Sequence, residues 1–357
     1  MKIPFLDLKS QYLSIKKEID REVLQTLRST NYSLGPKVRL FEENFSKFCN
    51  SKFTIGLNSG TSALHLALEA LNIGKGDEVI VFRPYWVSFP EFVRLSDAEP
   101  ILVETISKKN FEPDFSDLKT KITTKIKGVI INSPSNPTGG VWSSESISKL
   151  LKIAKEENWS IISDECYERL TYDRNFISIE KLNREHKIGA RVITCMSLSK
   201  TYAMTGWRIG YAAGPKDIIK AIGKIQSQST SNPSSVSQAA AVEALNGSQD
   251  FIVERSNAFK ERRDFVVKSL NSIKGINCLK PNGAFYVFPS CKGLLNKKTK
   301  LKTDTEFVQN LLEKQNVAVV QGSAFGLDGY FRISYATSME NLKKAMERIK
   351  SFCESLN

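Results

Sequence analysis

The sequence predicts an α/β protein with two unequal lobes, the larger built on a mostly parallel sheet and the smaller of α+β type. The first observation is length, because 357 residues are too many for one ordinary hydrophobic core. The second is a regular alternation of short apolar segments and amphipathic segments from about Phe53 onward. The third is a change of character after a long helical stretch, beyond which only short strands and a final helix are expected.

In the larger lobe, strands are expected where a short apolar run ends at a turn or a polar cluster. In chain order these runs are Phe53 to Leu57, Glu78 to Phe82, Pro100 to Val103, Gly128 to Asn132, Ser160 to Ser163, Val192 to Met196 and Gly210 to Ala213. Helices are expected between them, because apolar residues recur at three- and four-residue spacing in stretches such as Ser62 to Leu71 and Ser144 to Glu157.

The smaller lobe is expected after a long helix from about Gln249 to Ser272. Its strands are expected at Gly283 to Phe288, Ala318 to Val320 and Tyr330 to Ser334, and an amphipathic helix from Met339 to about Leu356 closes the chain. We therefore expect three parts: an N-terminal arm with part of the small domain at 1–31, a large domain at 32–250, and an interdomain helix with the small C-terminal domain at 251–357.

Composition argues against several classes of protein. The six cysteines are scattered and only two histidines accompany them, which indicates free thiols and no metal site. The net charge of +13 comes from lysines spread along the chain, so we expect a solvated surface and no nucleic-acid partner. The sequence shows neither an uncharged run of about 18 to 20 residues nor an apolar leader, so we expect no membrane association and a cytoplasmic location.

Polar residues follow the ends of most of the expected strands. Ser59-Gly60-Thr61 follows the first strand, Tyr85-Trp86 the second, Asn136 the fourth, Asp164 the fifth, and Ser197 to Lys200 the sixth. Ligands of open α/β sheets bind at the carboxyl ends of the strands, where loops present side chains to them. Segments far apart in the sequence are therefore expected to meet in one cleft.

The most specific pattern is the segment Ser-Leu-Ser-Lys-Thr-Tyr-Ala-Met-Thr-Gly-Trp-Arg-Ile-Gly from Ser197 to Gly210. Most lysines are solvated surface residues, but Lys200 follows an apolar strand, and Arg208 stands eight positions later, which suits a carbonyl-bound amine beside a phosphate site. The segment closely resembles the class I/II aminotransferases, which are pyridoxal 5'-phosphate (PLP) enzymes of fold type I. The resemblance implies a large PLP-binding domain in which Lys200 carries PLP as a Schiff base and moves the proton from the substrate Cα. It also implies that Ser197, Ser199 and Arg208 contact the cofactor phosphate.

Two further motifs carry the same resemblance. Asp164 stands in Ser-Asp-Glu-Cys-Tyr-Glu after an apolar strand, where an aspartate is more often a helix N-cap. A buried carboxylate would keep the pyridine nitrogen of PLP protonated, and the family assigns that role to Asp164 and a hydrogen bond to the cofactor phenolate to Tyr167. Asn136, in the turn-rich loop Asn-Pro-Thr-Gly-Gly, is implied to face the cofactor's phenolic oxygen and the substrate carboxylate.

Other site residues rest on weaker local signals. Gly60, Thr61 and Ser62 open a helix, whose N-terminal N–H groups suit a phosphate, although Ser and Thr are also ordinary caps. Trp86 could be core, but the resemblance places it flat against the pyridine ring and near the substrate. Tyr32 is implied to reach the phosphate bound by the neighbouring subunit.

Arg332 lies inside the apolar strand Phe-Arg-Ile-Ser-Tyr, where an unpaired charge would be costly. A structural salt bridge is one explanation. The other is a ligand, because a guanidinium matches a carboxylate with two parallel hydrogen bonds. The family uses this arginine for the α-carboxylate of the amino acid substrate.

Different regions of the chain resemble different families of aminotransferases. From about Gly76 to the C-terminus the sequence is similar to the prokaryotic branch of the aspartate-aminotransferase class, whereas Ile3 to Leu8, Tyr32 to Pro36 and Asn58 to His65 are closer to the sugar-nucleotide aminotransferases, a sister family. Preference for aspartate in the class requires a cation, either a lysine at the position of Thr61 or an arginine near Ser227 from the partner subunit. This chain has neither, so we expect aspartate to be a poor substrate.

The expected function is thus PLP-dependent transfer of an amino group between an α-amino acid and a 2-oxo acid. The alternative is a PLP-dependent lyase or cyclase acting on a modified amino acid, because Lys200, Asp164 and Arg332 would serve elimination, decarboxylation or cyclisation equally well. The expected assembly is a homodimer with active sites at the interface, since Tyr32 and the loop from Ser231 to Pro233 make best sense as groups that reach a partner's pocket.

Overall fold

The computed structural model describes residues 13, 16–32, 35–296 and 301–356. Parts of the N-terminal segments compared above lie outside the described residues, namely Ile3 to Leu8, Ser33 and Leu34. Of the expected arm at 1–31, the structure describes residue 13 and residues 16–31.

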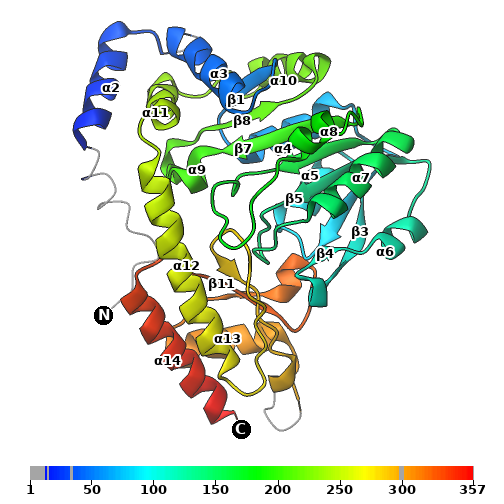
Figure 1. The fold of residues 1–357 in the computed structure, drawn as a ribbon, viewed down its shortest axis with the longest axis vertical. Coiled ribbons are helices and arrows are strands. Elements are labelled where there is room, and N and C mark those ends of the chain that lie inside the picture. Colours follow the sequence, from blue (N-terminus) through cyan, green and yellow to red (C-terminus); the bar gives the residue numbers. More distant parts are fainter. Residues whose placement is uncertain (1–12, 14–15, 33–34, 297–300, 357) are drawn as a thin grey trace.

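The larger sheet of the described chain has eight strands and is mostly parallel, as the sequence predicts (Figure 1). Its strands are β1 (Thr54–Leu57), β2 (Glu78–Arg83), β3 (Glu99–Ile106), β4 (Glu112–Pro113), β5 (Ile126–Asn132), β6 (Ser160–Asp164), β7 (Arg191–Ser197) and β8 (Gly210–Ala213), in the spatial order β1-β8-β7-β6-β5-β2-β3-β4. Strands β2, β3, β5, β6 and β7 run parallel, whereas β8 is antiparallel to both neighbours and β4 is antiparallel to β3. The expected α/β fold class is therefore confirmed.

Both faces of this sheet are covered by helices, which is why β6 is buried along its whole length. One face packs against α4 (Gly60–Ala70), α5 (Ser88–Leu95) and α10 (Lys216–Gln228), and the other against α7 (Ser144–Glu156) and α8 (Ile179–Glu185). Successive residues of β6 separate the two cores, since Ile162 belongs to the first and Ile161 to the second.

The N-terminal helices form a separate group at one end of the molecule (Figure 1). Helices α2 (Lys16–Ser29) and α3 (Pro36–Phe48) pack against α11 (Ser235–Asn246). The alanine-rich α11 has partners on more than one side, so its sequence lacks the single apolar stripe that would have predicted a helix. The short helices are α6 (Phe115–Thr120) and α9 (Leu198–Thr201), together with 3₁₀ turns at Ser107–Lys109, Thr205–Trp207, Lys292–Leu294 and Gly322–Phe325.

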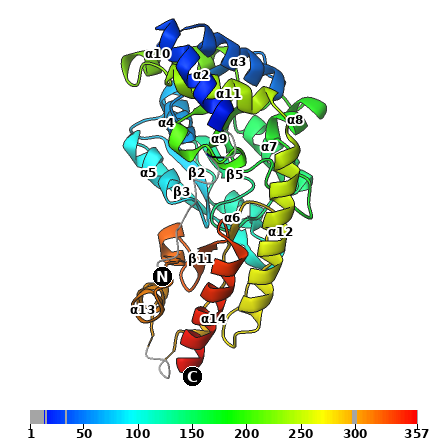
Figure 2. The same cartoon turned by 90° about the vertical axis from the view of Figure 1, so that its left-hand side faces the viewer.

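A long helix, α12 (Asp250–Asn271), leads from the large sheet to a smaller α+β unit (Figures 1 and 2). This unit contains β9 (Tyr286–Val287), β10 (Val320–Gln321), β11 (Phe331–Ser334), α13 (Asp304–Gln315) and α14 (Met339–Ser355). Its strands form an antiparallel sheet in the order β10-β11-β9. The core of the unit lies between this sheet and the helices and includes Phe307, Ile349 and Phe352.

The strands of the smaller unit are shorter than the sequence predicted. The expected strand Gly283 to Phe288 is reduced to two residues, because the N–H groups at its start bond to loops of the large sheet instead. Gly283 donates to the Gly139 carbonyl at 2.8 Å, and Ala284 donates to the Leu170 carbonyl at 2.8 Å. These bonds attach the smaller unit to the loops that follow β5 and β6.

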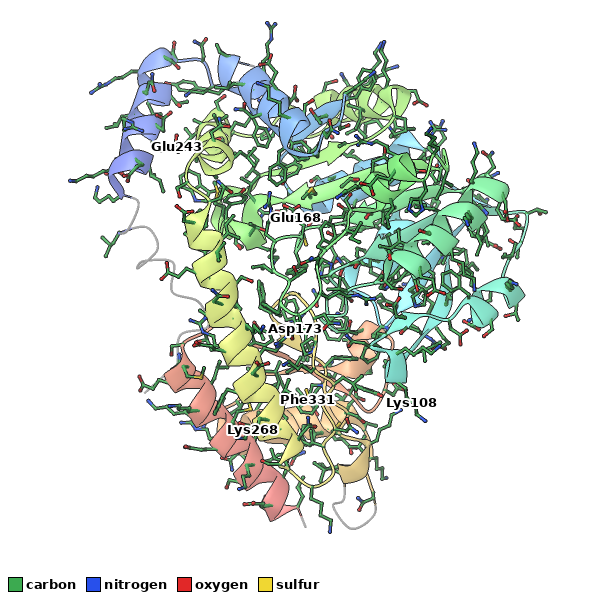
Figure 3. The ribbon with its side chains drawn as sticks, in the orientation of Figure 1. Lys108, Glu168, Asp173, Glu243, Lys268 and Phe331 are labelled. Atoms are coloured by element: carbon green, nitrogen blue, oxygen red, sulfur yellow. The ribbon has the colours of Figure 1, made fainter. Side chains whose placement is uncertain are left out.

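A buried arginine makes a second attachment between the two units. Arg263 of α12 is fully buried, and its Nη1 lies 2.7 Å from an Asp173 carboxylate oxygen and 2.9 Å from the Pro281 carbonyl. Asp173 lies in the chain after β6, and Figure 3 shows it beside α12, with Phe331 of β11 further into the smaller unit. The contacts of Arg263 therefore tie α12 to both sides of the region between the sheets.

Other expectations concern absent features. All six cysteines are free, as expected. No group of three or more His, Cys, Asp or Glu residues that could hold a metal occurs in the described chain. Across the same residues, no helix combines the length and the apolarity that spanning a membrane requires.

Candidate active site

Most of the predicted site residues line one cavity of about 160 Å³ at the carboxyl ends of β5, β6 and β7. The predicted residues in its wall are Gly60, Thr61, Trp86, Asn136, Asp164, Tyr167, Ser197, Ser199, Lys200 and Arg208. Ser59, Leu64, Asn132, Cys166 and Thr205 complete the lining. A larger hollow of about 980 Å³ between the end of α3 and α8 contains none of the predicted residues, so the chemistry is expected in the smaller cavity.

Lys200 projects from α9, a single helical turn that starts directly after β7. Ser197 caps this turn, because its Oγ accepts the Ser199 N–H at 3.1 Å and its hydroxyl bonds to the Ser199 hydroxyl at 2.8 Å. The ammonium lies 5.9 Å from the ring centroid of Tyr167 and 6.0 Å from that of Phe285. None of the ion pairs formed by described residues includes Lys200, so its amine is available to a ligand.

Asp164 is the last residue of β6 and is 7% exposed. Its Oδ1 accepts the Cys166 N–H at 3.2 Å, so the local turn that the N-cap interpretation required is present. Burial raises the pKa of Asp164 to about 6, and hydrogen bonds from Cys166 and the charge of Lys200 oppose the rise. A cationic group of a ligand would restore the charged carboxylate, which fits a protonated pyridine nitrogen.

A chain of hydrogen bonds connects the small sheet to the end of β6. Arg332 Nη1 donates to Asn136 Oδ1 at 2.8 Å, and the Asn136 N–H donates to Asn132 Oδ1 at 2.7 Å. Asn132 Nδ2 in turn donates to the Asp164 carbonyl at 3.1 Å. Arg332 of β11 and Asn136 of the loop after β5 therefore lie together beside the cavity, although 196 positions separate them in the sequence.

The Arg332 guanidinium lies between two aromatic rings. Its central carbon is 4.6 Å from the Tyr286 centroid and 4.9 Å from the Phe325 centroid. Its Nε is buried without a hydrogen-bond partner, and no ion pair between described residues includes this arginine. The salt-bridge explanation of Arg332 therefore fails within the described chain, and an anionic ligand is the partner that its chemistry calls for.

The opposite end of the cavity has the features of a phosphate site. Ser59 caps α4, and Gly60 and Thr61, the first two residues of that helix, line the cavity. Arg208 has a left-handed backbone with φ of 52°, and its Nη1 donates to the Thr205 carbonyl at 2.8 Å. A Cβ at Gly60 would stand 3.1 Å from the Ser197 Cβ and 3.3 Å from the Met196 carbonyl oxygen, so the start of α4 approaches the end of β7 closely.

Three predicted residues do not line this cavity: Arg332, which lies beside it, and Ser62 and Tyr32. Ser62 donates its N–H to Ser59 Oγ at 3.0 Å and bonds to the same hydroxyl through its own, so its polar groups are used inside the cap. Tyr32 is 51% exposed and donates its hydroxyl to the Leu27 carbonyl at 2.9 Å. Its predicted contact is with a partner subunit.

Trp86 lines the cavity and makes two edge-to-face ring contacts. Its centroid lies 5.5 Å from that of Phe89 and 5.9 Å from that of Phe92. Sequence reasoning did not assign Cys166 to the site, but Cys166 lines the cavity beside Asp164. It missed Tyr286 and Phe325 altogether, because nothing local in the sequence indicates that they flank Arg332.

Known proteins resemble the chain over almost its whole length. The family described as aminotransferase class I and II matches residues 5–349, so the family-level match includes the region before Gly76. The probable aspartate/prephenate aminotransferase of Rhizobium leguminosarum bv. phaseoli is 47% identical over 301 residues, which are 82% of this chain and 75% of that one.

Solved structures agree with the sequence relatives. The crystal structure of the aspartate aminotransferase from Rhizobium meliloti has a TM-score of 0.87 at 39% identity and covers 95% of this chain and 88% of its own. The alanine aminotransferase from Pyrococcus furiosus has a TM-score of 0.86 at 30% identity, with the same shares of the two chains covered.

Proposed function

This chain belongs to the class I and II aminotransferases, a family of PLP enzymes, and from that premise we propose that Lys200 holds the cofactor and moves the proton in the reaction of an α-amino acid with a 2-oxo acid. The observation that carries the proposal is the common cavity of Lys200 and Asp164, beside which Arg332 lies without an acidic partner among the described residues. When bound, PLP supplies an electron-accepting ring for the electron pair released at the substrate Cα.

We propose that the other residues of the cavity bind the ring and the phosphate of the cofactor. The Asp164 carboxylate pairs with the pyridine nitrogen and keeps it protonated, and Trp86 stacks on the ring. Ser197, Ser199, Arg208 and the N–H groups of Gly60 and Thr61 bind the phosphate, a set to which the sequence also assigned Ser62. These contacts would hold the cofactor in one orientation beside Lys200.

The substrate is held on the other side of the cavity. The Arg332 guanidinium binds the α-carboxylate with two parallel hydrogen bonds, and Asn136, already bonded to Arg332, contacts the same carboxylate. Tyr167 and Asn136 face the phenolic oxygen of the cofactor. With the carboxylate fixed, the substrate Cα would lie within reach of Lys200 Nζ, which would act as the base for its proton.

We propose that the preferred substrate has an uncharged side chain. Relatives of this chain are named for aspartate, prephenate or alanine, so the family name leaves the substrate open. Lys200 and Arg208 are the cations of the described cavity wall, and both have other roles. Thr61 and Ser227 stand where the family places a cation for a second carboxylate, so that group would lose its hydration without a charged partner.

We also propose a homodimer, because Tyr32 is exposed and outside its own cavity, as expected of a residue that serves the partner's phosphate site. Closed twofold dimers are the commonest oligomers. Sedimentation of active enzyme tests this, and a fully active monomer would contradict it.

The proposed reaction is tested by mixing the purified enzyme with a panel of amino acids and following cofactor absorbance and products together. Conversion of the bound cofactor to its amine form with release of a 2-oxo acid is expected. Release of ammonia or of a cyclic product instead would contradict amino transfer. Specificity constants for aspartate, glutamate and neutral amino acids then test the preference for an uncharged side chain.

A further inference from the structure

Tyr286 links the two halves of the site through its hydroxyl. It lies in β9 of the small sheet, and its hydroxyl is 3.0 Å from the hydroxyl of Tyr167, which follows β6 of the large sheet. Both side chains are buried, with 6% of Tyr286 and 3% of Tyr167 exposed. A hydrogen bond between two buried hydroxyls is directional, so the contact constrains where each proton points.

The ring of Tyr286 has a second contact of a different kind. Its centroid lies 4.6 Å from the central carbon of the Arg332 guanidinium. This proximity follows from the strand register, because Tyr286 pairs with Ser334 and Arg332 is two residues along β11 on the same face. One side chain therefore touches both the arginine proposed for the substrate carboxylate and the tyrosine proposed for the cofactor.

We propose that Tyr286 is a positioning residue that orders Arg332 with its ring and directs the Tyr167 proton with its hydroxyl. The inference rests on the proposed function, in which Tyr167 donates to the phenolic oxygen of the cofactor. A tyrosine hydroxyl has one proton, so a Tyr167 that donates to the cofactor must accept from Tyr286. A donor that is itself accepting a hydrogen bond becomes a stronger donor. Tyr286 thus stabilises the negative phenolic oxygen without touching it.

Packing alone is the competing explanation, because Tyr286 belongs to an aromatic cluster. Its centroid lies 4.8 Å from that of Phe285 and 5.8 Å from that of Tyr167. Packing depends on the ring and not on the hydroxyl. Tyr286→Phe keeps the ring and removes the hydroxyl, whereas Tyr286→Leu removes the ring as well, so the two substitutions separate the explanations.

The experiment is a pH titration of the absorbance of the enzyme-bound cofactor. A donor to the phenolic oxygen favours the unprotonated link between Lys200 and the cofactor and so lowers its pKa. Tyr286→Phe is expected to raise that pKa by roughly half a unit to one unit, the equivalent of one ordinary hydrogen bond. Tyr167→Phe should raise it further, and the double variant should equal Tyr167→Phe alone. Tyr286→Leu should in addition raise KM for the amino acid several-fold, which Tyr286→Phe should not.

Tyr335→Phe is the matched control, because Tyr335 is a buried tyrosine of the same unit that donates to the Ala284 carbonyl at 3.2 Å. Its titration should match that of the wild-type enzyme. An unchanged pKa in Tyr286→Phe, or effects of the two tyrosines that simply add, would overturn the proposal. Failure of the proposed binding of the cofactor by Lys200 has a different signature, since wild-type enzyme would then show no pH-dependent cofactor absorbance at all, and failure of amino transfer alone would appear only in the products.

Discussion

The two sheets contribute opposite kinds of electrostatic environment to the site. At the end of the large sheet, charges occur together. Burial raises the pKa of Asp164, and Lys200 lies close enough for its charge to oppose part of that rise. At the small sheet, Arg332 stands between two aromatic rings with a buried Nε and no acidic partner in the described chain. The large-sheet side therefore fits the proposed binding of a cofactor that carries both signs of charge, and the small-sheet side fits the proposed binding of an anionic substrate group.

Because the sheets differ, we expect a substitution on the large-sheet side to abolish the chemistry and a substitution on the small-sheet side to weaken substrate binding. Lys200→Ala should reduce turnover by at least about 10⁴-fold, because it removes the covalent link and the proton carrier together. The variant should remain folded and bind PLP noncovalently. Turnover and borohydride reduction with peptide mapping measure both effects, with the exposed Lys224→Ala of α10 as a control that should behave as wild type. A borohydride label on any lysine other than Lys200 would contradict the proposal that Lys200 holds PLP.

On the small sheet, Arg332→Leu should lower kcat/KM by about 10²- to 10³-fold, the loss of two charge-assisted hydrogen bonds. Most of the change should appear in KM, and cofactor absorbance should stay normal. Arg332→Lys keeps the charge but not the two parallel bonds, so it should recover only part of the loss. Steady-state kinetics with a neutral amino acid measures this. If Arg332→Leu weakened PLP binding as much as it weakened substrate binding, the proposed separation of cofactor binding on the large sheet from substrate binding on the small sheet would be wrong.

The pKa of Asp164 predicts a cost in stability on the large-sheet side. Its pKa is about 6 in the folded chain and about 3.9 in an unfolded one, so folding favours the protonated carboxyl. Stability of the cofactor-free protein should therefore fall as pH rises from 4 through 6, by about 2 to 3 kcal/mol in total from this group. Asp164→Asn has no charge to bury and should raise the Tm of the cofactor-free protein at pH 8, with a gain that shrinks towards pH 4.

Asp164→Asn should also weaken PLP binding, because the pyridine nitrogen loses its anionic partner. Thermal melts across pH, with and without PLP, measure the two effects. A variant that is less stable than wild type at pH 8 without cofactor would mean that the Asp164 carboxylate is compensated by a group other than the cofactor.

The smallest expected effect comes from adding a charge to the large-sheet wall. Thr61→Lys should raise kcat/KM for aspartate relative to a neutral amino acid by about tenfold, the value of one modest charge-assisted hydrogen bond. Thr61→Gln has similar length without the charge and should not shift the ratio. If wild-type enzyme already prefers aspartate by a wide margin, another cation serves the second carboxylate and the proposed substrate preference is wrong.

Much of the large-sheet side could be predicted because its signals are local. Each residue there sits at or just after an apolar strand, and parallel strands bring their carboxyl ends to one edge, so Asn136, Asp164 and Lys200 were expected to meet and do line one cavity. The limits of that inference lie within the same motifs. Ser62 belongs to the expected phosphate segment, yet its polar groups bond to Ser59, a detail of cap geometry that residue types do not reveal.

The small-sheet side shows what residue order leaves undetermined. An arginine in an apolar strand signals by itself that an anion is needed, so Arg332 was found from the sequence. Its aromatic neighbours Tyr286 and Phe325, its bond to Asn136 and the contact between Tyr286 and Tyr167 depend on how β9 and β11 pair and on where the small unit attaches to the large sheet. Local propensity and periodicity determine which segments become strands and which polar residues end them, and a parallel sheet brings those strand ends together. The contacts that depend on how the small sheet pairs and where it attaches to the large sheet are decided only when the chain packs.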